Sequence, residues 1–170
     1  MSRKQTRTRT EGRELIMERS FDAPKKLVYE AHVNPDSVAR WWGPTGWETH
    51  STEMAVEPGG VWHYCMRSSE DGQEAWGKAT YREVVPDARL VYVDAFADQY
   101  GNELAEMPKM LIQVDFSEEG KQTKITSRTL FDSEEELQKI IDMQAVEGMS
   151  ETYDRLDEFL HDQQKNKEEG

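Results

Sequence analysis

The sequence predicts an α+β fold in which a curved antiparallel sheet of about six to seven strands wraps around one long C-terminal helix, with two short helices after the first strand. Three observations predict it. Apolar residues recur with a 3.6-residue period across 132–160, as in a helix with one buried face. Short runs of alternating polarity fill 47–131 between turn residues, as in antiparallel strands. No alternation of strands with helices follows the first strand, which disfavours a parallel sheet.

The composition fits one acidic globular domain. The 170 residues are 36% hydrophobic, enough for a core, and carry a net charge of −13. A body this acidic repels phosphate backbones, so no nucleic-acid partner is expected. No apolar run approaches the ~18 residues of a membrane span, and no hydrophobic leader begins the chain, so we expect neither membrane insertion nor secretion. The lone Cys65 is consistent with a reducing cytoplasm.

Charge and polarity divide the chain into three parts. The basic residues of the first ten positions, which include no acid, are Arg3, Lys4, Arg7 and Arg9. We expect residues 1–12 to be a disordered basic tail, with an electrostatic tether as the alternative. Residues 13–160 are expected to form the single domain, and 161–170 a polar, frayed C-terminal tail.

The first three elements are a strand and two short helices. Residues 14–21 are rich in apolar side chains and predict a strand. Asp22-Ala23-Pro24 ends it and begins a helix at 25–32, because proline is tolerated in a first helical turn. Asn34-Pro35-Asp36 breaks this helix and caps a second one at 37–40. The two helices lead into an aromatic turn.

The central part of the chain reads as strands joined by tight turns. Glycines in Glu57-Pro58-Gly59-Gly60 and Asp71-Gly72 supply the positive φ that such turns require. Consecutive hairpins build an antiparallel, strongly curved sheet. The predicted strands are 47–56, 61–67, 75–85, 89–96, 109–116 and 122–131.

The last predicted element is a single helix of roughly 40 Å over 132–160. Asp132 and Ser133 are N-cap residue types, and each has a glutamate three positions later, as in a capping box. The apolar stripe needs a broad partner surface, which the concave face of the sheet supplies. A curved sheet that grips a straight helix leaves an elongated space between them, so we expect an apolar pocket there.

Aromatic and methionine side chains on the predicted inner faces are the candidate lining of this pocket. Period-2 alternation places one set on a single strand face, and the breaks in the helix stripe supply another. The candidate ligand-binding residues are Trp42, Trp62, Tyr64, Met66, Trp76, Tyr92, Phe96, Ile112, Val114, Gln144, Gly148, Met149 and Thr152.

Each of these residues also has a purely structural interpretation. Trp41 and Trp42 either form an aromatic platform at the mouth of the pocket or fill the gap between the short helices and the sheet, and the second interpretation is favoured. Gly148 lies mid-helix, where glycine costs about 1 kcal/mol relative to alanine. Its missing side chain either leaves room for a ligand or admits a large aromatic residue from the sheet.

Four spaced motifs resemble a known family. They are Phe21-Asp22-Ala23-Pro24 with Val28-Tyr29, Arg40-Trp41-Trp42-Gly43-Pro44, Pro58-Gly59-Gly60-x-Trp62, and Gly148-Met149-x-x-x-Tyr153-x-x-Leu156. Across about 14–160 the sequence resembles the START-like (SRPBCC) superfamily, and within it the bacterial proteins similar to the C-terminal domain of the heat-shock-protein-90 ATPase activator. In the last motif, Met149 and Tyr153 stand where the family usually has Trp and Leu, which bears on the shape of the pocket.

This resemblance implies the helix-grip fold and a hydrophobic ligand cavity, and its activator branch implies a chaperone partner and a part in the stress response. We expect a non-catalytic carrier or sensor that binds a small hydrophobic or aromatic molecule, lipid-like or polyketide-like, as a monomer or homodimer. Two alternatives stay open. One is a co-chaperone-like interaction domain, and the other is a cyclase or hydrolase that acts on a bound aromatic compound.

No catalytic residue, metal ligand or cofactor is assigned from the sequence. His63 and Cys65 lie two apart on one predicted strand and make only half of a metal site. One polar group in an apolar pocket more often orients a ligand than runs a reaction. The strand residues that would have to supply an acid, a base or an orienting group are Glu53, His63, Arg82, Asp94, Asp115 and Arg128.

Overall fold

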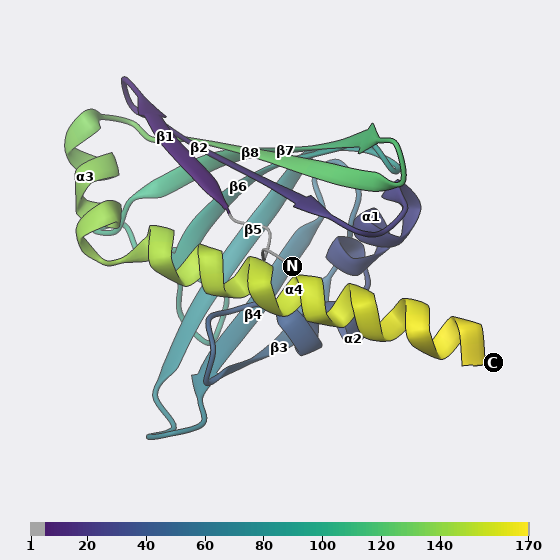
Figure 1. Cartoon of the computed structure of the whole chain (residues 1–170). Helices are drawn as coiled ribbons and strands as arrows, with labels where there is room; N and C mark the ends of the chain where they lie inside the picture. The colour runs from purple at the N-terminus through teal and green to yellow at the C-terminus, as the bar shows by residue number, and fades with distance from the viewer. Residues whose placement is uncertain (1–5, 170) are drawn as a thin grey trace.

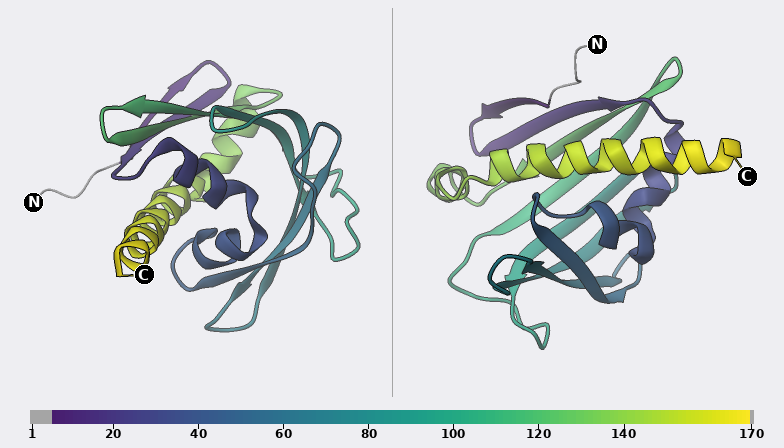
Figure 2. Two further views of the ribbon diagram at one scale, coloured as in Figure 1. Left: turned by 90° about the vertical axis from the view of Figure 1, so that its right-hand side faces the viewer. Right: turned by 60° about the horizontal axis from the view of Figure 1, so that its bottom comes forward.

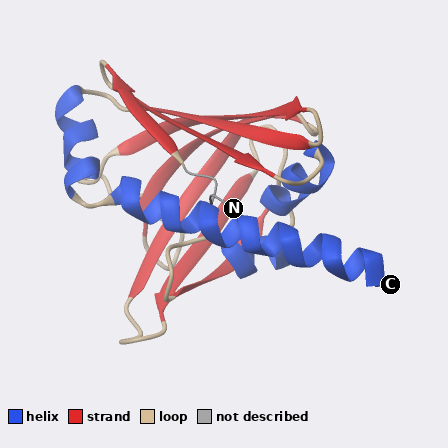
Figure 3. Cartoon of the chain, viewed as in Figure 1, coloured by secondary structure: helices blue, strands red, loops and turns tan. Residues whose placement is uncertain are grey.

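A curved, unclosed antiparallel sheet of eight strands and a long C-terminal helix make up the fold, which confirms the predicted class (Figures 1 and 3). The structure is a computed structural model and describes residues 6–169, with side chains to residue 165. The strands are β1 (Arg7–Glu11), β2 (Glu14–Phe21), β3 (Trp47–Met54), β4 (Val61–Ser68), β5 (Glu74–Val85), β6 (Arg89–Ala97), β7 (Lys109–Glu119) and β8 (Gln122–Leu130). The helices are α1 (Lys25–Val33), α2 (Pro35–Trp41), α3 (Glu134–Asp142) and α4 (Ala145–Glu169).

The strand order is β1-β2-β8-β7-β6-β5-β4-β3, so the early strand β2 pairs with the last strand β8. The register shifts between Ser51 and Glu53 and between Tyr81 and Glu83 mark irregularities that bend strands β3 and β5. Seen end-on, the sheet curves around α4 and the two short helices (Figure 2). The concave face is therefore the surface on which the core and any site between sheet and helix must form.

The two short helices fill one end of this concave face. Asn34 caps α2, and its side chain accepts a hydrogen bond from the Asp36 amide at 2.9 Å. Trp41 is fully buried, its ring lies 4.8 Å from that of His32, and its indole Nε1 donates to the Ala31 carbonyl at 2.9 Å. For Trp41, the structural interpretation is therefore correct: it anchors the helices to one another.

The prediction of one continuous helix over 132–160 is wrong. Ser133 caps α3 by accepting from the Glu136 amide at 3.1 Å, but the helix ends at Asp142. Gln144 then adopts a left-handed conformation with φ of 63°, and α4 begins at Ala145. The sequence does not reveal this break, because the apolar period runs across it and neither glycine nor proline marks the position.

Both predicted tails contain regular structure. Arg7–Glu11, expected to be disordered, forms β1 and pairs with β2, where Arg9 donates to Glu18 at 3.1 Å. Its alternating Thr and Arg residues suit an exposed edge strand, since β-branched and charged side chains both favour one. Residues 1–5 lie outside the described part of the chain. At the other end, α4 continues through the polar segment as far as Glu169.

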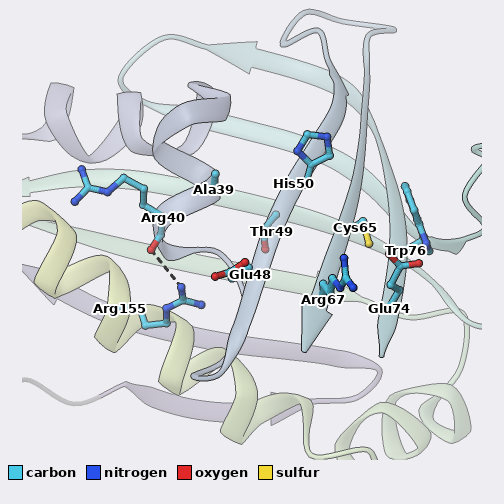
Figure 4. A pocket seen from close by; sticks show the side chains of 10 residues that line it. All are labelled: Ala39, Arg40, Glu48, Thr49, His50, Cys65, Arg67, Glu74, Trp76 and Arg155. Atoms are coloured by element: carbon cyan, nitrogen blue, oxygen red, sulfur yellow. Dashed lines mark hydrogen bonds between the residues drawn. The ribbon is translucent and has the colours of Figure 1, made fainter. Parts of the chain in front are cut away.

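Two consecutive residues hold α4 against opposite sides of the curved sheet. Asp154 accepts from Arg19 of β2 at 2.8 Å, and the Arg19 side chain is only 1% exposed. Arg155 donates on the other side to the end of α2 and to the turn that leads into β3. Figure 4 draws its hydrogen bond to the Arg40 carbonyl. The carbonyl acceptors of Arg155 belong to Arg40, Trp42, Gly43, Pro44 and Trp47.

The core lies in two clusters between the sheet and the helices. The larger one packs α1, α2 and the middle of α4, including Tyr153 and Leu156, against the centre of the sheet. The smaller one packs Leu137 and Ile140 of α3 against β2 and Phe131. Met149 contacts both clusters, so the first turns of α4 lie over the region between them.

Tyr64 of β4 lies flat over the backbone of Gly77, its direct partner on β5. A Cβ at position 77 would overlap the Tyr64 ring, so only glycine fits this close approach. Gly148 on α4 is the opposite case, since a Cβ there would meet no atom within 4 Å. Of the two interpretations of Gly148, the structure therefore excludes an aromatic residue packed against it.

These two glycines predict opposite effects of one substitution. Gly77→Ala should lower the free energy of unfolding by about 1–3 kcal/mol, because the Tyr64 ring must move. Gly148→Ala should raise it by up to about 1 kcal/mol, because alanine is the better helix former and the space is empty. Urea unfolding of both variants measures this. Equal changes in the two variants would contradict the described packing.

Candidate functional site

A cavity of about 370 Å³ lies between the concave face of the sheet, the first turns of α4 and the turn that follows α2. Its wall is mostly apolar and aromatic. Most of the residues predicted from the sequence to line a pocket do line it. They are Trp42, Tyr64, Met66, Tyr92, Phe96, Ile112, Val114, Gln144, Gly148, Met149 and Thr152.

Two predicted residues lie elsewhere. Trp62 is buried in the core, where its ring stacks on Tyr64 at 4.2 Å and its Nε1 donates to Ser51 Oγ at 2.9 Å. Trp76 is the direct partner of Cys65, so it points to the opposite face of the sheet from Tyr64. It lies against His63 there, at 5.1 Å between ring centroids. The prediction of both as cavity lining is therefore wrong.

The sequence missed the part of the wall that comes from β2, β8 and α3. Leu15 and Met17 of β2 face the cavity beside Ser127 and Thr129 of β8, their direct partners. The contact joins strands more than 100 residues apart, which no local pattern encodes. Ile140 reaches the cavity because α3 turns away from α4 at the break. Alternation in 123–129 shows which β8 side chains share a face, but not which face is concave.

Asp94 of β6 is the polar centre of the cavity wall. The Tyr64 hydroxyl donates to its two carboxylate oxygens at 3.1 and 3.3 Å. Burial raises the pKa of Asp94 from 3.8 to about 7, while the hydrogen bonds from Tyr64 and the Ala95 amide lower it. Because the burial effect is the largest, the carboxyl is partly protonated near neutral pH. Asp94 was one of the strand residues considered as an inward-facing polar group.

The other titratable side chain of interest in the wall is His32 of α1. Its Nδ1 lies 2.8 Å from the Val28 carbonyl, and burial lowers the pKa of His32 from 6.5 to about 4. The imidazole is therefore neutral at physiological pH, and its Nδ1 is already hydrogen-bonded to the backbone. Thr152 likewise donates its hydroxyl to the Gly148 carbonyl at 2.8 Å. Among the described residues that line the cavity there is no lysine or arginine.

A second hollow of about 700 Å³ lies beside β3, β4 and β5 (Figure 4). Trp76 and Cys65 line it together with both acidic and basic side chains, including Glu74 and Arg67. Arg155 faces it but is already bound to backbone carbonyls. This hollow mixes acidic and basic side chains, whereas the lining of the first cavity is mostly apolar, and we take the apolar cavity as the candidate site.

Neither a metal centre nor a membrane span emerges from the described residues. Within residues 6–169 no group of three or more His, Cys, Asp or Glu side chains is placed to hold a metal ion. In the same part of the chain, the helices lack the length and apolar character needed to cross a membrane.

The fold and the cavity together define a helix-grip domain with a mostly apolar cavity between sheet and helix. The family model described as "Activator of Hsp90 ATPase homolog 1-like protein" matches residues 22–161. The chain therefore belongs to this family, within the START-like proteins that the sequence motifs resemble, and the fold commonly binds hydrophobic ligands. No curated protein matches the chain.

Solved structures of bacterial proteins share the fold. Protein Ms6760 from Mycobacterium smegmatis is 25% identical, with a TM-score of 0.85 over 92% of this chain and 96% of that one. A protein from Arthrobacter aurescens is 27% identical, with a TM-score of 0.86 over 92% and 91%. A protein from Staphylococcus epidermidis is 26% identical, with a TM-score of 0.81 over 92% and 94%.

The raised pKa of Asp94 predicts a pH-dependent cost to stability. The folded protein binds this proton more tightly than the unfolded chain, so stability falls as the pH rises from 3.8 to about 7 and is level above that. Relative to the parent, Asp94→Asn should therefore be more stable at pH 8 than at pH 4, by up to about 4 kcal/mol. Urea unfolding across this pH range measures the difference. A gap that stays constant with pH would contradict the buried position of the carboxyl.

Proposed function

We propose that this chain binds a small hydrophobic or aromatic molecule, lipid-like or polyketide-like, in the cavity under α4, and acts as a carrier or sensor without chemistry of its own. The observation that carries the proposal is the apolar cavity of about 370 Å³, bounded by sheet and helix side chains. This volume lies within the range of small-molecule sites, about 300–1,000 Å³.

Water is a poor occupant for such a space. A volume of 370 Å³ corresponds to roughly twelve waters at about 30 Å³ each, and a stable buried water needs two to four polar partners. The wall is mostly apolar, and two of its polar side chains, His32 and Thr152, are already bonded to backbone carbonyls. An apolar ligand would remove this wall from water and gain about 25 cal/mol for each Å² buried.

The wall supports binding better than catalysis. Acid–base catalysis needs groups that can exchange protons with a substrate at working pH. Asp94 is the one carboxylate among the described lining residues, and the pKa of His32 is lowered to about 4 by burial. With a pKa of about 7, Asp94 can exchange a proton near neutral pH, but no other acid or base among the described lining residues is shown to do so beside it. A single carboxyl beside a tyrosine suits the orientation of a ligand better than a reaction. A cyclase or hydrolase activity is therefore the weaker interpretation.

Filling the cavity from the helix side tests the proposal. Gly148→Leu places a side chain in the empty space at that position, whereas Glu147→Leu adds the same side chain on the exposed side of α4. The polarity-sensitive probe prodan has no hydrogen-bond donor and fits the apolar wall. We expect Gly148→Leu to weaken prodan binding at least tenfold, which is about 1.4 kcal/mol, and Glu147→Leu to leave it unchanged.

The outcomes of that titration are distinct. Native mass spectrometry of the freshly purified chain adds a direct search for a retained ligand. A ligand at 100 times its dissociation constant should stabilise the fold by about 2.7 kcal/mol. If prodan does not bind the parent, or binds Gly148→Leu as tightly, the cavity is not a ligand site.

The family description favours a second candidate, a co-chaperone-like domain that contacts a heat-shock-protein-90 chaperone. This role would place the chain in the cytoplasm and in the stress response. It predicts that the purified chain binds the chaperone in a pull-down and stimulates its ATPase. Absence of both binding and stimulation would remove this candidate.

A further inference from the structure

Asp94 has spare hydrogen-bonding capacity directed at the cavity. An ionised carboxylate offers about four acceptor sites, and the structure fills some of these with the Tyr64 hydroxyl and the Ala95 amide. The flanking positions on neighbouring strands are Ala79 and Met110, which donate nothing from their side chains. Because Asp94 lines the cavity, its remaining acceptor positions are open to the space in which a ligand would sit.

Asp94 is the one charged side chain among the described lining residues, and its charge is negative when it is ionised. The described lining residues include no lysine or arginine, and the imidazole of His32 is neutral. The aromatic rings of Tyr64, Tyr92 and Phe96 line the same space, and their faces carry partial negative charge. A ligand carboxylate would find no cation here and would meet a second carboxylate. A cation or a neutral donor would meet both acceptor oxygens and ring faces.

We propose that the cavity selects ligands with a single hydrogen-bond-donating head group, a protonated amine above all, that lies against Asp94 while the apolar body of the ligand fills the space toward α4. This inference rests on the proposed function of the cavity. It names the ligand class as apolar or aromatic amines, with neutral alcohols and phenols bound less tightly, and excludes fatty acids and other organic anions.

Physical magnitudes support this order of preference. Charge-assisted hydrogen bonds are about twice as strong as neutral ones, and a desolvated cation over an aromatic ring gains about 2 kcal/mol. A buried carboxylate that lacks a cation is costly, and an ammonium group offsets that cost. An alcohol donates one neutral hydrogen bond and leaves the cost in place. A carboxylate ligand adds like-charge repulsion in a low-dielectric space.

The groups that face Asp94 do not titrate in the same pH range. Tyr64, Tyr81 and Tyr92 all have pKa values raised above 10 by burial, with the Asp94 charge as a further cause. From α4, burial raises the pKa of Tyr153 to about 12, and from α1 His32 has a pKa of about 4. Between pH 6 and 8, Asp94 is therefore the group around the cavity whose charge changes.

Three matched naphthalene derivatives test the head-group preference on the full chain. 2-Naphthylmethylamine, 2-naphthalenemethanol and 2-naphthoic acid share one apolar body and differ in the head group, which is an ammonium, a hydroxyl or a carboxylate. Displacement of prodan at pH 7.5 should rank the amine first and the acid last, at least 100-fold apart. In the parent, affinity for the amine should rise about tenfold from pH 6 to pH 8, as the ionised fraction of Asp94 grows from about 0.09 to about 0.91.

Matched variants separate the charge from the fold. Asp94→Asn should lower the affinity for the amine at least tenfold and remove the pH dependence of its binding. The affinities for prodan and for the alcohol should be nearly unchanged. Asp115→Asn, which removes a carboxylate that pairs with Arg89 outside the cavity, should leave amine binding as in the parent. Tyr64→Phe, which keeps the carboxylate but removes its hydroxyl donor, should keep the preference for the amine over the acid.

The failures are distinguishable. If prodan binds but the acid binds as tightly as the amine, or Asp94→Asn leaves amine affinity unchanged, the head-group assignment is wrong and the cavity remains a ligand site. If prodan does not bind the parent chain at all, the proposed function fails, and this inference fails with it.

Discussion

The structure depends on how α4 is tied across an open sheet. Asp154 pairs with Arg19 of β2, and Arg155 donates to backbone carbonyls of the turn that leads into β3. These two contacts reach opposite ends of a sheet whose edge strands are β1 and β3. Arg19 is almost completely buried, and both of its carboxylate partners, Asp154 and Asp157, lie on α4. A shift of the helix that removed both would leave an uncompensated charge inside the protein, which is strongly unfavourable. The position of α4 is therefore fixed by charge as well as by packing.

The cavity is a consequence of that fixed position. The helix cannot approach the sheet along its whole length, because the sheet curves and α4 is straight (Figure 2). Beyond Tyr153 the space is filled by the main core, whereas before it Gly148 contributes no side chain. The strands then present Asp94 to a space with few polar partners, which is why burial dominates its pKa. A carboxyl in such a place lowers stability, and a ligand that donates a hydrogen bond offsets that loss.

Local patterns in the sequence predicted most of the strands, the helices and the cavity wall. What they missed depends mainly on contacts between residues far apart in the chain. Alternation on β4 correctly placed Tyr64 and Met66 on the inner face. It failed for Trp76 because the register of the β4–β5 hairpin sets Gly77, not Trp76, opposite Tyr64. The break at Gln144 was invisible because its left-handed backbone is occupied by a residue other than glycine. Met17 reaches the cavity because β2 pairs with β8. Local periodicity does not predict a pairing between strands so far apart in the sequence.

Residues of α4 before about Tyr153 line the cavity, and those after it pack in the core. The two parts of the helix are therefore under different evolutionary constraints. Substitutions after this point meet Leu156, Phe159 and Leu160 in the core and are opposed by loss of stability. Substitutions in the preceding turns, at Gly148 for example, reshape the cavity and leave the contacts of residues 154 and 155 intact. Selection can then alter what such a domain holds while the scaffold persists, and sequences can drift far apart without a change of fold.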